Sequence, residues 1–329
     1  MQMSTTRGDK DMKPTALIFS IYILVMSLAV CALFTSCQGQ DNSNADGYVV
    51  FEDALGRRVS IAEQPKRVAA LLGSFADVWR LAGGELCAFA EDAVSDFGMS
   101  SDGAVIIGGA HSPSLELLLS ANPDFVIASS TVAKNVEMLD TLEALGITVA
   151  YFDVKNFDDY LNMLDICTRI TGRRDLYEQN GLAQKERIDA VKVGFAETVA
   201  QNERSILLLR TAASTLKAKG SSGTVLGEML CDIGSVNIAD SDTALLDQLS
   251  IEAIIKENPY HIFVVTMGSD TEAALASFYS MINENPAWET LDAVKYGRVH
   301  IMDKALYNLK PNSRFAEAYE KLYEIFIEK

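Results

Sequence analysis

The sequence has few basic residues and no run of them. Lysine and arginine total 28, against 45 aspartate and glutamate residues, and the formal net charge is −17. An acidic chain repels nucleic-acid phosphates and anionic lipid headgroups unless a local basic patch overrides its field. We therefore expect no nucleic-acid partner.

Motifs for metal binding and catalysis are also missing. The three histidines and five cysteines form no CxxC or HExxH pattern, and a zinc or manganese site needs several clustered ligands. The chain contains no GxSxG elbow, no P-loop and no GxGxxG motif, which mark common hydrolases and nucleotide-binding enzymes. We expect no enzyme activity, no resident cofactor and no directly bound metal.

Residues 1–36 have the pattern of an export signal. Three basic residues precede an apolar stretch that runs from Ala16 to Leu33, as in the basic and hydrophobic regions of a signal peptide. The stretch is close to the length that spans a bilayer, so an uncleaved membrane helix is the alternative. Residues 34–37, Phe-Thr-Ser-Cys, resemble a bacterial lipobox with a small residue before the cysteine.

Cys37 is therefore the predicted lipid attachment site. Phe34 is unusual in a lipobox, but Cys31 is a poorer candidate because the preceding Val30 is large. Residues 37–47 are polar without apolar periodicity, which is typical of a flexible tether. We expect a protein held at the cell membrane by its lipid alone, on the extracytoplasmic face. Loss of residues 1–36, with three basic and two acidic residues, leaves a net charge of −18.

The other cysteines cannot all pair. Cys87, Cys167 and Cys231 each lie among apolar residues, and free cysteine behaves as a small, usually buried apolar residue. They are predicted to be buried free thiols rather than a redox or metal site.

The rest of the chain alternates short apolar runs with amphipathic stretches. A hairpin is predicted at residues 48–61, with a turn at Gly56, and residues 67–152 then follow the order strand, helix, strand. That order is typical of α/β lobes with mostly parallel sheets, and it resumes at residue 205. We expect two Rossmann-like α/β lobes, at residues 48–156 and 204–329.

Residues 157–203 between these lobes are predicted to be helical. One helix starts at Phe157 and ends near Gly172, and a second carries apolar residues at spacings of three and four from Ile188 to Val199. A helix over residues 175–201 would be about 40 Å long. We interpret it as a rigid bridge between the lobes, with a surface helix on one lobe as the alternative.

A ten-residue segment occurs twice. Residues 114–123, SLELLLSANP, correspond to residues 250–259, SIEAIIKENP, and each copy leads into an apolar strand. The offset of 136 residues is about one lobe, so the chain contains two related halves. Serine at the N-cap and glutamate in the first turn stabilise a helix start, which alone could explain Glu116 and Glu252. Their equivalent places also favour a shared docking surface.

These features resemble the solute-binding proteins of iron-siderophore, haem and cobalamin importers. The resemblance runs from Tyr48 to the end and rests on the order of seven short segments: DALGRRV at 53–59, PKRV at 65–68, the two Ser-x-Glu segments, GEML at 227–230, NPAW at 285–288, and AVKYGRV at 293–299. It implies two lobes joined by one long helix, with small lobe closure. It also implies that Glu116 and Glu252 dock with the permease subunits of an ABC importer. We expect the protein to be a monomer.

Ligands of two-lobed α/β proteins bind where loops leave the carboxyl ends of strands. Such loops hold ten candidate contacts: Ser74, Phe75, Phe97, His111, Ser130, Arg210, Lys217, Lys219, Met267 and Tyr307. Arg210 follows an apolar run, so it could grip an anionic chelate with two hydrogen bonds, or it could form a salt bridge. Lys217 and Lys219 are weaker candidates, predicted as solvated loop charges.

The aromatic and histidine candidates each have a structural alternative. Phe75, Phe97 and Tyr307 could stack on a flat ligand or could pack in the core. His111 lies in a loop and could reach a haem iron or remain a surface residue. His261 and His300 lie within apolar strand patterns and are predicted to be structural.

Together these patterns predict capture of a pre-formed metal chelate, foremost a ferric siderophore, and its delivery to an ATP-driven importer. Haem or cobalamin is the alternative ligand. A chelatase-like or nitrogenase-like enzyme and a lipid-anchored ligand sensor are alternatives from other classes.

Overall fold

The computed structural model describes residue 2 and residues 47–62, 64–268 and 270–328. The predicted export signal, Cys37 and residues 37–46 of the tether lie outside this set. Within it, no helix is both long enough and apolar enough to cross a membrane. The described residues from Gly47 onward belong to one compact unit.

An antiparallel hairpin begins the folded unit. β1 (Tyr48–Glu52) pairs with β2 (Arg58–Ala62), which confirms the predicted hairpin. In the turn, Gly56 has a φ of 73°, and the Asp53 carboxylate accepts hydrogen bonds from the backbone and the guanidinium of Arg57. The same guanidinium donates to the Val149 carbonyl at 2.8 Å. This ion pair therefore fastens the hairpin to the first lobe.

The first lobe contains a five-stranded sheet in which all neighbours are parallel. The strand order is β5-β4-β3-β6-β7, with β3 (Val68–Ala70), β4 (Leu86–Phe89), β5 (Val105–Ile106), β6 (Phe125–Ser129) and β7 (Thr148–Phe152). A parallel sheet is covered on both faces and its strands are apolar throughout. In β6, accordingly, Phe125 and Ile127 join one core cluster while Val126 and Ala128 join another.

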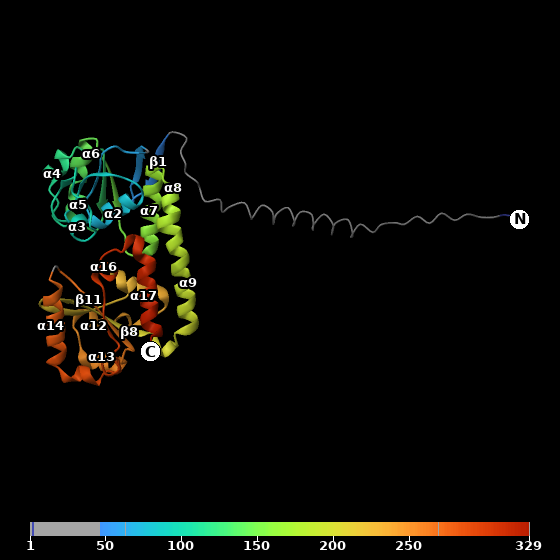
Figure 1. The fold of residues 1–329 in the computed structure, drawn as a ribbon, viewed down its shortest axis with the longest axis vertical. Coiled ribbons are helices and arrows are strands. Elements are labelled where there is room, and N and C mark those ends of the chain that lie inside the picture. Colours follow the sequence, from blue (N-terminus) through green and yellow to red (C-terminus); the bar gives the residue numbers. More distant parts are fainter. Residues whose placement is uncertain (1, 3–46, 63, 269, 329) are drawn as a thin grey trace. The chain divides into compact units, whose positions relative to one another are not determined.

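Five helices cover this sheet (Figure 1): α2 (Gly73–Leu81), α3 (Asp92–Ser95), α4 (Leu115–Ser120), α5 (Ala133–Glu137) and α6 (Leu139–Ala144). α2 is buried from Gly73 to Trp79. It begins so close to α3 that a Cβ on Gly73 would lie 2.4 Å from the Ala93 backbone nitrogen. Only glycine fits this approach.

The second lobe has a sheet of the same kind. Its parallel order is β10-β8-β11-β12, and β9 pairs antiparallel with β8; the strands are β8 (Ser205–Ala212), β9 (Thr215–Lys219), β10 (Val236–Asn237), β11 (His261–Thr266) and β12 (Val299–Ile301). The predicted α/β fold class is thus confirmed. The prediction of Lys217 and Lys219 as loop charges is wrong, because both lie on β9. β9 is a short strand that returns antiparallel to β8, whereas the sequence pattern of this lobe predicts only strands that alternate with helices.

The helices of this lobe are α10 (Val225–Ile233), α11 (Ile238–Ser241), α12 (Ala244–Asp247), α13 (Ile251–Glu257), α14 (Thr271–Asn283), α15 (Asp292–Lys295), α16 (Lys304–Tyr307) and α17 (Phe315–Ile327), with 3-10 turns η3 (Pro286–Thr290) and η4 (Asn312–Arg314). Cys231, on α10, is exposed, so the prediction that it is buried is wrong. Met229, Leu230 and Ile233 form the buried side of that helix, and Cys231 falls on the other side. Cys167 is buried, Cys87 is partly buried, and all three are free thiols.

The duplicated segment folds in the same way in both lobes. The Ser114 hydroxyl accepts the Leu117 N–H at the start of α4, and the Ser250 hydroxyl accepts the Ala253 N–H at the start of α13. In each copy an asparagine in the left-handed region follows the helix, with φ of 48° at Asn122 and 42° at Asn258. The sequence repeat is therefore a repeated helix-to-strand unit.

A helical segment connects the lobes: α7 (Phe157–Thr171), α8 (Arg174–Tyr177), the π-helical turn η1 (Glu178–Leu182), α9 (Ala183–Thr198) and the 3-10 turn η2 (Gln201–Glu203). The Asn180 amide donates to the Leu81 carbonyl of the first lobe. Farther along, the Phe195 ring lies 4.9 Å from that of Phe326 on α17 of the second lobe. The long helix therefore bridges the lobes, as predicted (Figure 1).

The two lobes share an apolar core. Phe315 of α17 lies 5.5 Å from the rings of both Phe157 and Tyr160 on α7. One buried cluster includes these residues together with Phe125 of the first sheet and Phe263 of the second. Large lobe movements would have to break this cluster.

We expect Gly73→Ala to lower the free energy of unfolding by about 1–3 kcal/mol, the usual effect of overpacking. Its Cβ would meet backbone atoms of Asp92 and Ala93, which cannot rotate away. Gly109→Ala is the control, because its nearest atom is the flexible Glu91 Oε1 at 3.2 Å. Urea denaturation of both variants measures the difference, and equal midpoints would contradict the packing argument.

Candidate functional site

The carboxyl ends of the two parallel sheets meet. Ser74 follows β3 in the first lobe, and Asn312 lies in the segment that follows β12 in the second. The Asn312 amide donates to the Ser74 carbonyl and to the Asp77 carboxylate, both at 2.9 Å. Ligands of α/β sheets bind at this end of the strands. The contact therefore brings two ligand-binding edges together.

Asn312 is buried and is held from three sides. It has a φ of 49°, a region that asparagine tolerates better than most residues. Gln184 of the linking helix α9 donates to the Asn312 carbonyl at 3.3 Å and accepts from the Ala316 N–H at 3.2 Å. α2, α9 and the loop before α17 are thus joined at one buried point, which we call the Asn312 junction.

Arg210 lies near the carboxyl end of β8, where the sequence predicts it. Its side chain is partly buried, and its Nε is buried with no hydrogen-bond partner in the described part of the chain. Burial lowers the pKa of the guanidinium. Among the described residues Arg210 forms no salt bridge. Of the two alternatives stated for Arg210, a salt bridge or a ligand contact, the ligand contact remains.

Two lysines accompany Arg210. Lys217 is paired directly with Arg210 in the β8–β9 register, and Lys219 is paired with Leu208. Burial lowers the pKa of Lys219, and the charges of Arg210 and Lys217 lower it further. The edge of the second sheet is thus a local concentration of positive charge in an acidic chain.

A fourth cation was not predicted. The Lys310 Nζ lies 5.9 Å from the centre of the Phe75 ring. Burial lowers its pKa, and the charges of Asp153 and Asp92 partly offset that effect. Lys310 lies two residues before Asn312, so the junction fixes its position. The local sequence pattern does not reveal the contact between Lys310 and Phe75, because that contact forms only where the two lobes meet.

Asp92 was also missed by sequence reasoning. Its Oδ2 accepts the Gly73 N–H at 2.9 Å, while its Oδ1 is buried without a partner among the residues that the structure describes. Burial raises the pKa of this carboxyl group.

Of the aromatic candidates, two belong to the core. Phe75 is 1% exposed and packs edge-on against Phe152, and Tyr307 is 3% exposed with its hydroxyl donating to the Ala318 carbonyl. Burial raises the pKa of Tyr307. Neither ring has a free face for a ligand, so both pack in the core, the alternative to ligand stacking stated above.

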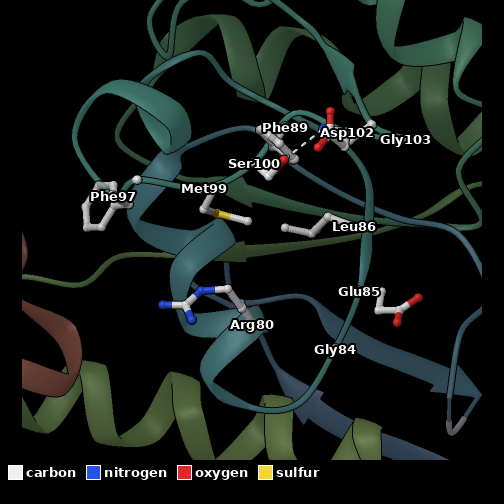
Figure 2. Close-up of a pocket in the computed structure, with 12 residues that line it drawn as sticks. Arg80, Gly84, Glu85, Leu86, Phe89, Phe97, Met99, Ser100, Asp102 and Gly103 are labelled. Carbon is white, nitrogen blue, oxygen red and sulfur yellow. Dashed lines mark hydrogen bonds between the residues drawn. The ribbon is translucent and has the colours of Figure 1, made fainter.

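Phe97 is partly exposed and borders a depression of about 700 Å³ in the first lobe. Figure 2 shows Phe97, Met99 and Leu86 around it, with Arg80 at one side. Arg80 is already engaged in a 2.5 Å ion pair with Asp77. Its other charged lining residues, Glu85 and Asp102, are exposed acids, so the depression offers an anionic chelate no free cation among the described residues.

Of the remaining candidates, Ser130, His111 and Met267 lie in loops as predicted, whereas Ser74 lies in the first turn of α2, because that helix begins at Gly73. Ser74 is buried, Ser130 is partly buried, and His111 and Met267 are exposed. The Ser130 N–H donates to the Phe152 carbonyl, and the Met267 N–H donates to the Thr211 carbonyl. Their contact with a ligand stays a prediction.

The other two histidines pair with each other. The His261 Nδ1 and the His300 Nε2 are 2.9 Å apart, and burial lowers the pKa of His261 to about 3. Burial also lowers the pKa of His300, which is partly buried, and the contact between the two rings agrees with the structural role predicted for them. Over residues 47–62, 64–268 and 270–328, no three His, Cys, Asp or Glu side chains gather as a metal site would require.

The two repeat glutamates are exposed in the first turns of their helices. Glu116 forms no ion pair with any described residue, and Glu252 only accepts from the Ser250 hydroxyl at 3.1 Å. A depression of about 510 Å³ lies beside Glu252 and is bordered by Ile251 and Trp288. Both carboxylates are therefore accessible to a partner.

Comparison with known proteins gives consistent results. The chain is 25% identical to YhfQ of Bacillus subtilis (strain 168), provisionally named an ABC transporter substrate-binding lipoprotein, over 91% of the chain and 93% of YhfQ. It is also 25% identical to the Fe(3+)-citrate-binding protein YfmC of the same organism, over 86% of the chain and 89% of YfmC.

Solved structures share the fold. The crystal structure of Staphylococcus aureus SirA complexed with staphyloferrin B matches with a TM-score of 0.65 and 22% identity, covering 84% of the chain and 98% of SirA. The sequence profile of the family described as periplasmic binding protein matches residues 68–306. The chain therefore belongs to the periplasmic binding protein family, as its duplicated helices and paired α/β lobes led us to expect.

Proposed function

We propose that this protein is the substrate-binding lipoprotein of an ABC importer, and that it captures a ferric chelate of the siderophore type. The observation that carries the proposal is the cationic edge at Arg210, which lies at the ligand-binding end of the second sheet and lacks an anionic partner among the described residues. The names of YhfQ, YfmC and the SirA complex support the same class of ligand and partner.

The proposed role is binding without chemistry on the ligand. Two of the groups that could act as acids or bases near the sheets are engaged elsewhere, Tyr307 with the Ala318 carbonyl and His261 with His300, while the buried Asp92 carboxyl group keeps one oxygen without a partner among the described residues. Iron enters as part of the cargo, so the protein needs no resident cofactor. This disfavours the chelatase-like alternative, and the buried Phe75 and Tyr307 give haem no stacking surface at this edge.

A binding titration tests the proposal. Residues 38–329, which keep every described residue of the compact unit, are expected to bind at least one ferric siderophore more tightly than haem or cobalamin. Isothermal titration calorimetry measures the affinity. Fluorescence provides a second readout, because Trp79 and Trp288 are 2% and 4% exposed and respond by energy transfer to the coloured chelate. Binding of an unrelated solute, with no response to any chelate, would overturn the ligand class.

We further propose that Glu116 and Glu252 dock the two lobes onto the permease subunits. Both are exposed at equivalent positions of a structural repeat. Helix capping explains the serines fully, but a glutamate in the first turn adds only about 0.3–1 kcal/mol.

The double variant Glu116→Lys/Glu252→Lys is expected to weaken binding to the cognate permease at least about tenfold, because each docked carboxylate would face a like charge. Chelate affinity should be unchanged. Asp140→Lys/Glu257→Lys is the matched control, since both positions are exposed on helices of the same two lobes. Pull-down with the permease in nanodiscs measures docking. Equal docking by the two double variants would refute the assignment.

Cys37 is proposed as the lipid anchor, with the protein on the extracytoplasmic face and working as a monomer. Cys37→Ser is expected to abolish the diacylglyceryl addition in the intact mass of the membrane-extracted protein. Cys31→Ser should retain it, because the lipobox ends at Cys37. Retention of the lipid in the Cys37 variant would place the anchor elsewhere.

A further inference from the structure

The cations Arg210, Lys217 and Lys219, which we call the β8–β9 cation triad, share one face of the second sheet. Arg210 and Lys217 are direct partners in the antiparallel register, and Lys219 lies two residues beyond Lys217. Paired residues lie on the same face, about 5 Å apart at Cβ, and residues i and i+2 lie about 7 Å apart on that face. The three charged groups therefore start from points within about 8 Å of one another.

This face leads toward the first lobe. Along β8, Ile206 and Leu208 alternate onto the same face as Arg210, and both belong to the core cluster shared by the lobes. On this face of β8, apolar side chains are therefore followed by the charged Arg210 near the carboxyl end of the strand. The Asn312 junction brings the same end of this sheet against the first lobe.

The triad is short of partners. The Arg210 Nε is buried without an acceptor, and none of the three side chains forms an ion pair within the described ranges. Mutual repulsion contributes to the lowered pKa of Lys219, and no carboxylate offsets it. In a chain with 45 acidic residues, three neighbouring cations without a carboxylate indicate that the anion comes from outside.

The chemistry of the triad restricts the anion. A guanidinium binds a planar carboxylate with two parallel hydrogen bonds, while ammonium groups act as point charges. A single monocarboxylate neutralises one of the three charges, so the ligand must present several anionic oxygens over a short span. A neutral hydroxamate complex would bring no anionic oxygen to the buried Arg210 Nε and would leave the charges of Lys217 and Lys219 without a counter-ion. The rings of Phe75 and Tyr307 are buried, so neither offers a stacking surface to a flat chelate.

We propose that the β8–β9 cation triad grips a polycarboxylate, so that the cargo is an anionic iron(III) complex of the hydroxycarboxylate class. This inference rests on the proposed function and names its substrate class. Arg210 serves as the bidentate contact. Lys217 and Lys219 supply the charge that selects a polyanion over a neutral chelate.

Calorimetric titration of residues 38–329 with ferric citrate, a neutral ferric trihydroxamate and haem tests the inference. Wild type is expected to bind ferric citrate most tightly, with affinity that falls as salt is raised. Arg210→Gln should weaken the binding of ferric citrate at least about tenfold, because it removes a partly buried charge contact. Lys219→Gln should weaken this binding less, because the Lys219 charge is more exposed. Arg210→Lys should fall between Arg210→Gln and wild type.

Lys256→Gln is the control variant, because Lys256 is exposed on α13 in the same lobe. Thermal unfolding checks that each variant is folded, and Lys219→Gln carries the test if Arg210→Gln does not fold. If the trihydroxamate or haem binds as tightly as ferric citrate, or if the triad variants bind ferric citrate like the control, the polycarboxylate assignment is wrong while the proposed function stands. If no iron chelate binds, the proposed function itself fails.

Discussion

The Asn312 junction is the constraint on which the arrangement of the site depends. The buried side-chain amide of Asn312 donates to the backbone and to a carboxylate of the first lobe, while the backbone carbonyl of Asn312 accepts from the linking helix. A buried polar group that loses its partner destabilises a fold by about 1–3 kcal/mol, so separating the lobes at this point would leave several groups unpaired at once. The shared apolar cluster around Phe315 opposes the same movement. The two ligand-binding edges are therefore held at a set distance by the fold, and a ligand finds them already in place.

Charge is distributed unevenly around this fixed frame. The chain as a whole is acidic, yet the second lobe presents Arg210, Lys217 and Lys219 together, and Lys310, next to the junction, lies against the Phe75 ring of the first lobe. Exposed charges farther apart than about 8–10 Å are largely screened at physiological ionic strength. The overall negative charge therefore repels polyanions from most of the surface, while a small ligand close to the edge experiences mainly the local cations. Such a pattern favours compact anions over nucleic acid or acidic lipid surfaces.

Much of the fold was predictable from the sequence because its signals are local. Alternating strands and helices, Gly172 at a helix end, and the repeat at Ser114 and Ser250 all reflect contacts within a few residues, and each was confirmed. The site was less predictable, because its features depend on pairing between distant segments. Lys217 and Lys219 lie near Arg210 because β9 pairs with β8. Lys310 contacts Phe75 because the lobes meet, and Tyr307 is held by a hydrogen bond to α17. Arg210 was identified because a cation directly after a buried run must emerge at a strand end. Which of the loop residues touch a ligand still depends on chemistry that pattern alone does not encode.

The unpaired cations and the fixed frame act together in binding. Burial and mutual repulsion disfavour the charged forms of Arg210 and Lys219 in the free protein, which is why their pKa values are lowered. An anion placed between them reverses both effects, so its arrival raises these pKa values and stabilises the folded, ligand-bound state. Since the Asn312 junction already holds the two edges in place, little of this gain is spent on ordering loops or closing lobes. The fold therefore maintains an unfavourable arrangement of like charges in the free state, and that arrangement gives a polyanionic ligand its advantage over a neutral one.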